Sequence, residues 1–337
     1  MTTPYVIGIG NAIMDVIAPT TDQALARLGI EKGIMQLIDR DRAEGLTAAQ
    51  AADSAAVRLA PGGSVANTLA GIGMLGLRTA FIGRVAADPL GLSYAEQTEA
   101  AGTVFVNPPV NPPVAGEVEP TSRSIIFVTP DGERSMNTYL GISAELGESD
   151  VNPAVFSGAD WLFLEGYLFD KDAGKAAFLR ATEACHAAGG QAGIALSDPF
   201  CVDRHRGDFR KLVAGPMDYV IGNIHEWQSL YQTEDLEDAL RQARADCGTV
   251  ICTRSGDDAI LIRGDERVLA PVRRIVPVDA TGAGDQFAAG LIYGLATGAP
   301  LAAAGRMACI AAAEVISHVG PRPERDIRPD FRAEGLI

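Results

Sequence analysis

The chain has 337 residues, of which 47% are hydrophobic and 21% are charged, and its formal net charge is −15. This length and composition predict one globular α/β domain over residues 1–337 with a large core. The negative charge argues against nucleic acid or an anionic membrane as a partner. The five cysteines have no C-x-x-C spacing and no apolar stretch approaches membrane-spanning length, so we expect reduced cysteines in a cytoplasmic protein.

The first predicted strand, Tyr5–Gly10, ends in a Gly-x-Gly sequence and is followed by Asn11 and Asp15. A dinucleotide fingerprint would need a third glycine where Ile13 stands and a helix after it, but the next residues alternate like a strand. An oxidoreductase is therefore a minor alternative. Asn11 and Asp15 can together bind a vicinal diol, because an amide donates and a carboxylate accepts. Ordinary loop polarity explains either residue alone.

A double glycine, Gly62-Gly63, stands before a helix rich in small residues that contains Asn67. The segment from Ala48 to Leu59 is rich in alanine and predicts a further helix ahead of it. The two glycines favour a close approach of the backbone to a ligand. Asn67 then becomes a candidate for substrate binding, whereas a solvated helix position is the simpler interpretation.

Residues 103–141 contain several prolines and two β-rich runs joined by Pro130-Asp131-Gly132, which is a hairpin signal. A small sheet without helices of its own cannot stand as a domain. Together with residues of about 12–38, it predicts a β-sheet lid inserted into the main domain. Arg134 lies in the hairpin, where it either folds over a bound substrate or is a solvated strand residue.

From about residue 153 onward, predicted strands and helices alternate, which indicates a mainly parallel sheet with helices on both faces. Ligands bind at the carboxyl ends of such strands. Two polar motifs fall at these ends. The first runs from Asn223 to Glu226 and has the spacing of a helix capping box, and the second is the turn Thr253-Arg254-Ser255-Gly256.

The last motif follows Arg274–Val278, which we predict to be a strand, and opens a helix. Gly282-Ala283-Gly284 forms the turn, and its free N–H groups and the positive end of the helix dipole make an anion site. Asp285 follows in the first helical turn. An isolated aspartate there usually caps the helix, but a carboxylate beside a bound phosphate is repulsive without a cation or a proton to transfer. A general base that deprotonates a hydroxyl group fits this arrangement.

The sequence D-A-T-G-A-G-D-Q-F at residues 279–287 resembles the C-terminal signature of the ribokinase-like (PfkB) carbohydrate and nucleoside kinases. Gly62-Gly63-x-x-x-Asn67 resembles the N-terminal signature of the same family. Both are in the expected order, and the resemblance covers essentially the whole chain. It implies a three-layer α/β fold with a mainly parallel central sheet, helices on both faces and a small β-sheet lid.

The resemblance also implies roles for the candidate residues. Asp285 would be the catalytic base, and Glu226 would orient Mg²⁺, through water or directly. A potassium site would lie near Asp279 and residues 316–321. The remaining assignments are an anion hole of Gly282, Ala283 and Gly284, substrate binding by Asn11, Asp15, Gly62, Gly63, Asn67 and Arg134, and nucleotide binding by Asn223, Thr253, Arg254, Ser255 and Gly256.

Asn11-x-x-x-Asp15 after a glycine resembles the adenosine kinase branch, whereas many sugar kinases carry an acid where Asn11 stands. We therefore expect an enzyme of purine salvage that transfers the γ-phosphoryl group of ATP, with Mg²⁺, to the 5′-hydroxyl of adenosine or a related nucleoside. A fructokinase, ribokinase or keto-deoxy-sugar-acid kinase of the same fold is the alternative. A nucleotide-sensing protein without catalysis is a remote one. The oligomeric state stays open between monomer and homodimer.

Overall fold

The main sheet of the structure is built from short, buried strands. The computed structural model describes residues 3–53, 56–111 and 118–337. Within them, nine strands pair in parallel except at the two pairs that involve β13. In spatial order they are β14 (Glu266–Ala270), β13 (Asp257–Arg263), β12 (Thr249–Arg254), β11 (Tyr219–Asn223), β10 (Gln191–Ala195), β9 (Trp161–Glu165), β1 (Tyr5–Ile9), β5 (Arg78–Ile82) and β6 (Thr103–Phe105).

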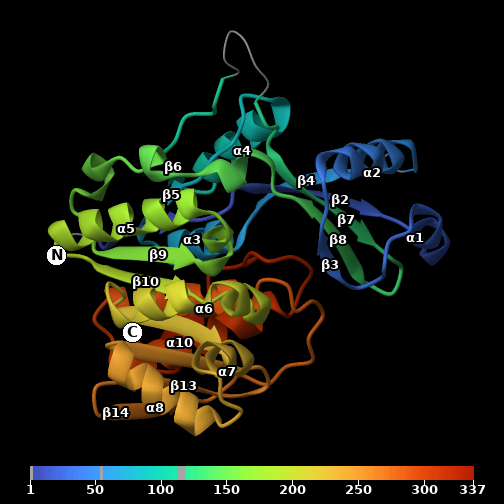
Figure 1. Cartoon of the computed structure of the whole chain (residues 1–337). Coiled ribbons are helices and arrows are strands. Elements are labelled where there is room, and N and C mark those ends of the chain that lie inside the picture. Colours follow the sequence, from blue (N-terminus) through green and yellow to red (C-terminus); the bar gives the residue numbers. More distant parts are fainter. Residues whose placement is uncertain (1–2, 54–55, 112–117) are drawn as a thin grey trace.

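Helices cover both faces of this sheet (Figure 1). Successive strand side chains point to opposite faces, so Val6 packs into one core and Ile7 into the other. In the described part of the chain, no helix is both long and apolar enough to cross a membrane. One face carries α3 (Ser64–Met74), α4 (Pro89–Ala100), α9 (Ala283–Ala296), α10 (Leu301–Val315) and α11 (Arg328–Ala333), and the other carries α5 (Asp172–Ala187), α6 (Pro199–Ala214), α7 (Ile224–Tyr231) and α8 (Leu236–Asp246).

A second, smaller sheet forms the lid, at the right of Figure 1. Two helices, α1 (Asp22–Leu28) and α2 (Arg40–Asp53), pack on it through a small apolar cluster that includes Leu25, Leu46 and Phe127. The hairpin predicted at Pro130-Asp131-Gly132 joins its antiparallel strands β7 and β8. In spatial order the strands are β3 (Met35–Leu37), β8 (Arg134–Tyr139), β7 (Ser122–Val128), β2 (Ile13–Pro19) and β4 (Arg58–Gly62).

The lid differs from the prediction at two places. The helix expected at 48–59 is α2, which ends at Asp53, and Arg58–Gly62 instead pairs with β2 as strand β4. Pro61 and Gly62 are poor helix residues, and pairing with β2 gives their backbone its partners. Thr103–Phe105, expected in the lid, forms β6 at the edge of the main sheet. Residues 112–117 of the predicted lid lie outside the described residues.

The strand predicted at Arg274–Val278 is also wrong, because this segment has no regular structure. The side chains of Val276 and Val278 are 88% and 62% exposed. The Val278 N–H donates to the carbonyl oxygen of Ile316 at 2.8 Å, but no ladder continues from that bond. An apolar run becomes a strand only where a neighbouring strand pairs with it, and here the neighbour is a loop.

Helices α9 and α10 approach closely through glycines of α9. A Cβ on Gly290 would lie 2.6 Å from the Met307 carbonyl oxygen, and one on Gly294 would lie 2.7 Å from the Cα of Ala304. These glycines therefore let the two helix backbones touch along the second half of α9.

We expect Gly290→Ala to destabilise the protein by about 1–3 kcal/mol, because the added methyl overlaps backbone atoms that cannot move aside. Gly45→Ala is the matched control, since a Cβ on this exposed residue of α2 meets nothing within 4 Å. It should raise stability by up to about 1 kcal/mol through helix propensity. Urea unfolding of both variants tests this, and equal effects of the two substitutions would contradict it.

Candidate active site

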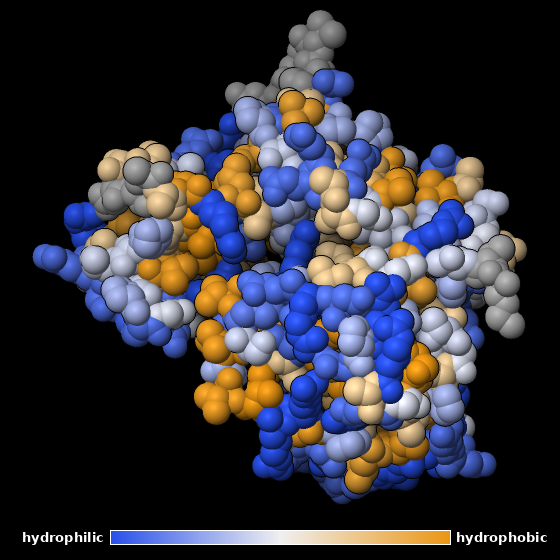
Figure 2. Space-filling view, turned by 180° about the vertical axis from the view of Figure 1, so that it is seen from behind, coloured by the Kyte–Doolittle hydropathy of each residue, from blue (hydrophilic) through white to orange (hydrophobic). Residues whose placement is uncertain are grey.

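A cleft of about 840 Å³ opens between the lid and the carboxyl ends of the parallel strands. Lid strands β2, β3, β7 and β8 line one side of the cleft, and the ends of β9 to β12 line the other. The first turns of α3 and α9 close its floor. Seen from behind in Figure 2, hydrophobic side chains gather at the left, where the lid meets the main body.

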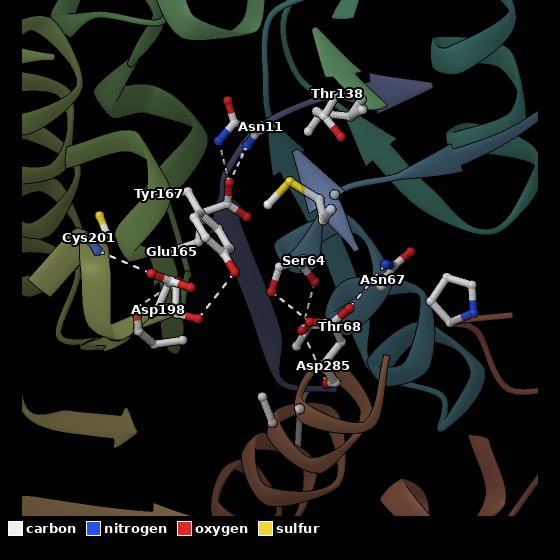
Figure 3. A pocket seen from close by; sticks show the side chains of 18 of the residues that line it. Asn11, Ser64, Asn67, Thr68, Thr138, Glu165, Tyr167, Asp198, Cys201 and Asp285 are labelled. Carbon is white, nitrogen blue, oxygen red and sulfur yellow. Dashed lines mark hydrogen bonds between the residues drawn. The ribbon is translucent and has the colours of Figure 1, made fainter. Parts of the chain in front are cut away.

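Asp285, in the first turn of α9, is held by the first turns of α3 (Figure 3). Its carboxylate accepts hydrogen bonds from Ser64 Oγ at 2.6 Å and Asn67 Nδ2 at 3.1 Å. Its backbone carbonyl accepts one from Thr68 Oγ1 at 3.2 Å. Burial raises the pKa of Asp285 to about 6, and the two side-chain hydrogen bonds and the positive charge of Arg322 oppose that rise. A carboxylate with this pKa is mostly ionised at neutral pH and close enough to it to accept a proton.

The turn before Asp285 has the geometry of an anion site, except that one of its N–H groups already has an acceptor. Gly282 has a φ of 81°, and a Cβ there would lie 2.5 Å from Pro321, so only glycine fits. The Ala283 N–H already donates to the Ala280 carbonyl oxygen at 3.2 Å. No acceptor among the described residues takes the N–H of Gly284, whose position is exposed on the cleft. Of the three predicted residues, Ala283 is therefore the one whose N–H is already engaged, whereas no acceptor is found for the N–H groups of Gly282 and Gly284 among the described residues.

Asp15 lies in the cleft on lid strand β2 and is only 6% exposed. Burial raises its pKa to about 7, while the charges of Arg134, Arg322 and Arg58 oppose that rise. Asn67 is equally buried at the floor, and its Oδ1 accepts a hydrogen bond from Arg322 Nε at 3.1 Å. The fold thus places these two predicted substrate residues in one cleft with Asp285.

Asn11 lines the same cleft but is largely engaged by the protein. Its backbone N–H and its Nδ2 each donate to Glu165 Oε1 at 2.7 Å, and its Oδ1 accepts from Ser143 Oγ at 3.0 Å. One Nδ2 hydrogen is left for a ligand. Glu165 is 1% exposed, and burial raises its pKa to about 7. This carboxylate fixes Asn11 and also accepts from the Val65 N–H at 3.2 Å.

The double glycine makes room for groups of Asn11 and Asp15. A Cβ on Gly62 would lie 2.7 Å from the Asp15 carboxylate, and one on Gly63 would lie 2.1 Å from the Asn11 carbonyl oxygen. Gly63 lines the cleft and has a φ of 100°. The absence of a Cβ on the two glycines therefore lets Asn11 and Asp15 take their positions. A contact of Gly62 and Gly63 with the substrate stays a prediction.

Arg134 points from the lid toward the main domain, and it is not one of the residues that line the cleft. Its Nη1 lies 2.9 Å from Asp279 Oδ2, and both side chains are at least 90% buried. The Asp279 carboxylate also accepts from the backbone N–H groups of Thr281 and Gly320, each at 2.9 Å. Three donors therefore occupy this carboxylate, and one of them is a guanidinium. The potassium site near Asp279 and residues 316–321 stays a prediction.

The predicted nucleotide residues divide into two groups. Asn223 and Glu226 line the cleft and form the expected capping box of α7, in which each side chain accepts from the other's backbone N–H. Thr253 also lines it. Arg254 instead donates through Nε to the Asp258 carbonyl oxygen at 2.6 Å, outside the cleft lining. Ser255 and Gly256 follow it in an exposed turn, with Ser255 at a φ of 54°.

Comparison with known proteins agrees with this geometry. The family model of the pfkB family carbohydrate kinases matches residues 33–327. The chain belongs to the PfkB family. Members of this family are phosphotransferases that act on hydroxyl groups, so the chain is a kinase of a small molecule.

This PfkB kinase is similar both to sugar kinases and to an adenosine kinase, as three relatives show. A fructokinase from Klebsiella pneumoniae is 28% identical over 252 residues, which are 70% of this chain and 77% of the relative. The structure of a probable sugar kinase from Rhizobium etli is 42% identical, covers 100% of both chains and has a TM-score of 0.87. That of adenosine kinase from Sinorhizobium meliloti is 40% identical, covers 99% of this chain and 100% of the other, and also has a TM-score of 0.87.

The sequence analysis did not predict several of the residues that line the cleft of this PfkB kinase. Helix α6 was not predicted, and its first turns bring Asp198, Phe200 and Arg204 to the cleft. Figure 3 shows Asp198 close to Tyr167. Asp198 caps the helix by accepting from the Phe200 N–H at 2.7 Å, and Pro199 occupies the first helical position. An Asp-Pro pair is a helix-start signal that the sequence did contain.

The lining of the cleft is strongly acidic. Among the described lining residues, Arg204 is the only lysine or arginine. Glu226 is 6% exposed, and burial and the nearby Asp198 charge raise its pKa to about 7. Oxygen donors of this kind fit a hard divalent cation, which an anionic nucleotide would need here. The carboxylates are Asp15, Glu165, Asp198, Glu226 and Asp285.

We expect Ser64→Ala to raise the pKa of Asp285 above about 6, because the lost hydrogen bond stabilises the ionised carboxylate. A ¹³C NMR titration of the carboxyl carbon measures it. Ser93→Ala on α4 is the control and should leave the titration unchanged. A midpoint that falls or stays constant in Ser64→Ala would contradict the assigned hydrogen bond.

Proposed function

We propose that this kinase transfers the γ-phosphoryl group of ATP to the 5′-hydroxyl of adenosine or a related nucleoside, as an enzyme of purine salvage. The apolar side of the cleft carries this proposal. Met35 and Leu37 of lid strand β3 are 52% and 57% exposed, although they line the cleft. Exposed apolar side chains of this kind suit a flat base, whereas a free sugar presents hydroxyl groups on all sides. Ile13, Met136 and Leu140 continue this apolar surface.

The similarity to the Sinorhizobium meliloti adenosine kinase supports the same acceptor. A sugar such as fructose is the alternative, and it is favoured by the fructokinases among the relatives. In either case, Asp15 and Asn67 would bind adjacent hydroxyl groups of the acceptor. Asn11 would add its one remaining N–H.

Asp285 would act as the general base. It would take the proton of the acceptor hydroxyl while the oxygen attacks the γ-phosphorus in line. The bond from this phosphorus to the β–γ bridging oxygen breaks, ADP leaves, and the proton stays on Asp285. N–H groups of the Gly282-Ala283-Gly284 turn would stabilise the charge that develops on the phosphoryl oxygens. For Ala283 this requires release of its bond to Ala280.

We assign the nucleotide to the edge formed by β11 and β12. Asn223 and Thr253 would contact it directly, and Arg254, Ser255 and Gly256 would follow on the turn. Glu226, together with Asp198, would hold Mg²⁺ directly or through water. When bound, the ion would neutralise phosphate charge, which the acidic lining otherwise repels.

The lid would exclude water, which competes with the acceptor for the phosphoryl group. Arg134 joins the lid to the main domain through Asp279, so we propose that it stabilises the closed lid rather than binding the acceptor. Because ATP is the donor, we place the enzyme in the cytoplasm. The five cysteines are scattered along the chain without C-x-x-C spacing, which agrees with that compartment.

A phosphorylation screen with MgATP against adenosine, inosine, guanosine, ribose and fructose tests the acceptor. We expect adenosine to give the highest kcat/KM, because only a nucleoside fills the apolar side of the cleft. ADP release and the mass of the product are both measured. If only a free sugar is phosphorylated, the nucleoside proposal is wrong while the kinase assignment stands.

Leu37→Ser serves as the matched variant in this screen. It should raise KM for adenosine several-fold through lost apolar contact and leave any ribose turnover unchanged. Leu269→Ser is its control, because Leu269 is 56% exposed on β14, away from the cleft lining.

Asp285→Asn should lower kcat by about 10²–10⁴-fold, because an amide cannot accept the hydroxyl proton. Binding of MgATP, measured by calorimetry, should survive, since the turn and the nucleotide edge are intact. Turnover near that of the unchanged protein would show that Asp285 is not the base.

A further inference from the structure

Arg322 lies on the segment that follows α10, and this segment is fixed beside the start of α9. The Gly320 N–H donates to Asp279 at 2.9 Å, and Gln286 Nε2 donates to the Pro321 carbonyl oxygen at 3.1 Å. Further along, the Glu324 N–H donates to the buried carboxylate of Glu314 at 3.2 Å. The backbone on both sides of Arg322 is therefore tied to the main domain.

The guanidinium of Arg322 determines which way the Asn67 side chain points. An amide has one acceptor end and one donor end, whereas a guanidinium only donates. Since Arg322 Nε donates to Asn67 Oδ1 at 3.1 Å, the Nδ2 end must face the other way. There it donates to Asp285 Oδ2 at 3.1 Å. A chain of two hydrogen bonds thus runs from Arg322 to the base.

Arg322 also supplies the positive charge of this region. Two carboxyl groups and one neutral phenol face Asp285 from other elements, and in the described part of the chain Arg322 is the one cation that acts on it. A buried carboxylate among like charges tends to take up a proton unless a cation opposes it. The facing groups are Asp15 on β2, Glu165 on β9, Tyr167 in the turn after β9, and Arg322 itself.

We propose that Arg322 is a positioning residue of the phosphoryl transfer. It turns the Asn67 amide so that this side chain donates to Asp285, and its charge keeps that carboxylate ionised while the acceptor is bound. Arg322 does not line the cleft and acts through Asn67 and Asp285. This inference rests on the proposed function for its catalytic consequence, but not for the orientation and charge of the site.

The test compares Arg322→Gln and Arg322→Lys with Arg325→Gln. Arg325 is three residues further along, is half exposed and pairs with Asp330, so its variant removes the same charge outside the site. We expect Arg322→Gln to move the acid limb of the kcat/KM profile upward by about one pH unit, since loss of a nearby cation raises the pKa of a carboxylate. Arg322→Lys keeps the charge, so the acid limb of its profile should lie close to that of the unchanged protein. Arg325→Gln should leave the acid limb unmoved.

A ¹³C titration of the Asp285 carboxyl carbon in the free protein gives a second measurement that needs no turnover. The resonance is assigned by its loss in Asp285→Asn. The same upward shift in Arg322→Gln would support the inference even if no tested acceptor were phosphorylated. A lower kcat with an unmoved limb and an unmoved titration would show that Arg322 only stabilises the fold. Equal shifts in the Gln and Lys variants would overturn the role of its charge.

Discussion

The contact between the first turns of α3 and α9 is the interaction on which the site depends. Ser64, Asn67 and Thr68 all bond to Asp285, which lies more than 200 residues further along the chain. Gly71 of α3 lets the two helices approach, because a Cβ there would meet the Gln286 side chain of α9 at 2.1 Å. This junction fixes the carboxylate at the floor of the cleft. It also joins the acceptor side of the molecule to the turn that would bind phosphate.

Charge is the second constraint, and it separates the roles of similar residues. Burial raises the pKa of Asp15, Glu165, Glu226 and Asp285 toward neutrality. What distinguishes the four is their partners. Glu165 is occupied by backbone and amide donors, and Glu226 caps a helix. Asp15 and Asp285 both face the cleft, but Asp15 lies on the lid, whereas Asp285 follows the turn at Gly282–Gly284. This position beside the turn is why we propose Asp285 as the general base.

The lid combines a polar strand with an apolar one across the same cleft. Asp15 on β2 can bind hydroxyl groups, whereas Met35 and Leu37 on β3 present hydrocarbon. An acceptor that satisfies both must itself have a polar and an apolar half. This is the physical reason for preferring a nucleoside to a sugar. The ion pair of Arg134 with Asp279 connects this sheet to the loop before Asp285.

The sequence by itself determined the features that depend on neighbouring residues. The turn at Gly282–Gly284 with Asp285, the capping box from Asn223 to Glu226, the β7–β8 hairpin and the three-layer fold all follow from local spacing or periodicity. The Asp-Pro pair at the start of α6 is a local signal of the same kind.

Only the tertiary structure decided which distant groups meet. The partners of Gly63 and Asn11, the exposed course of Arg274–Val278 and the approach of Arg322 to Asn67 leave no local pattern. A glycine, an arginine or an apolar run has the same local signature whatever packs against it. Its role is set by the packing of segments far apart in the sequence, and that packing exists only once the chain has folded.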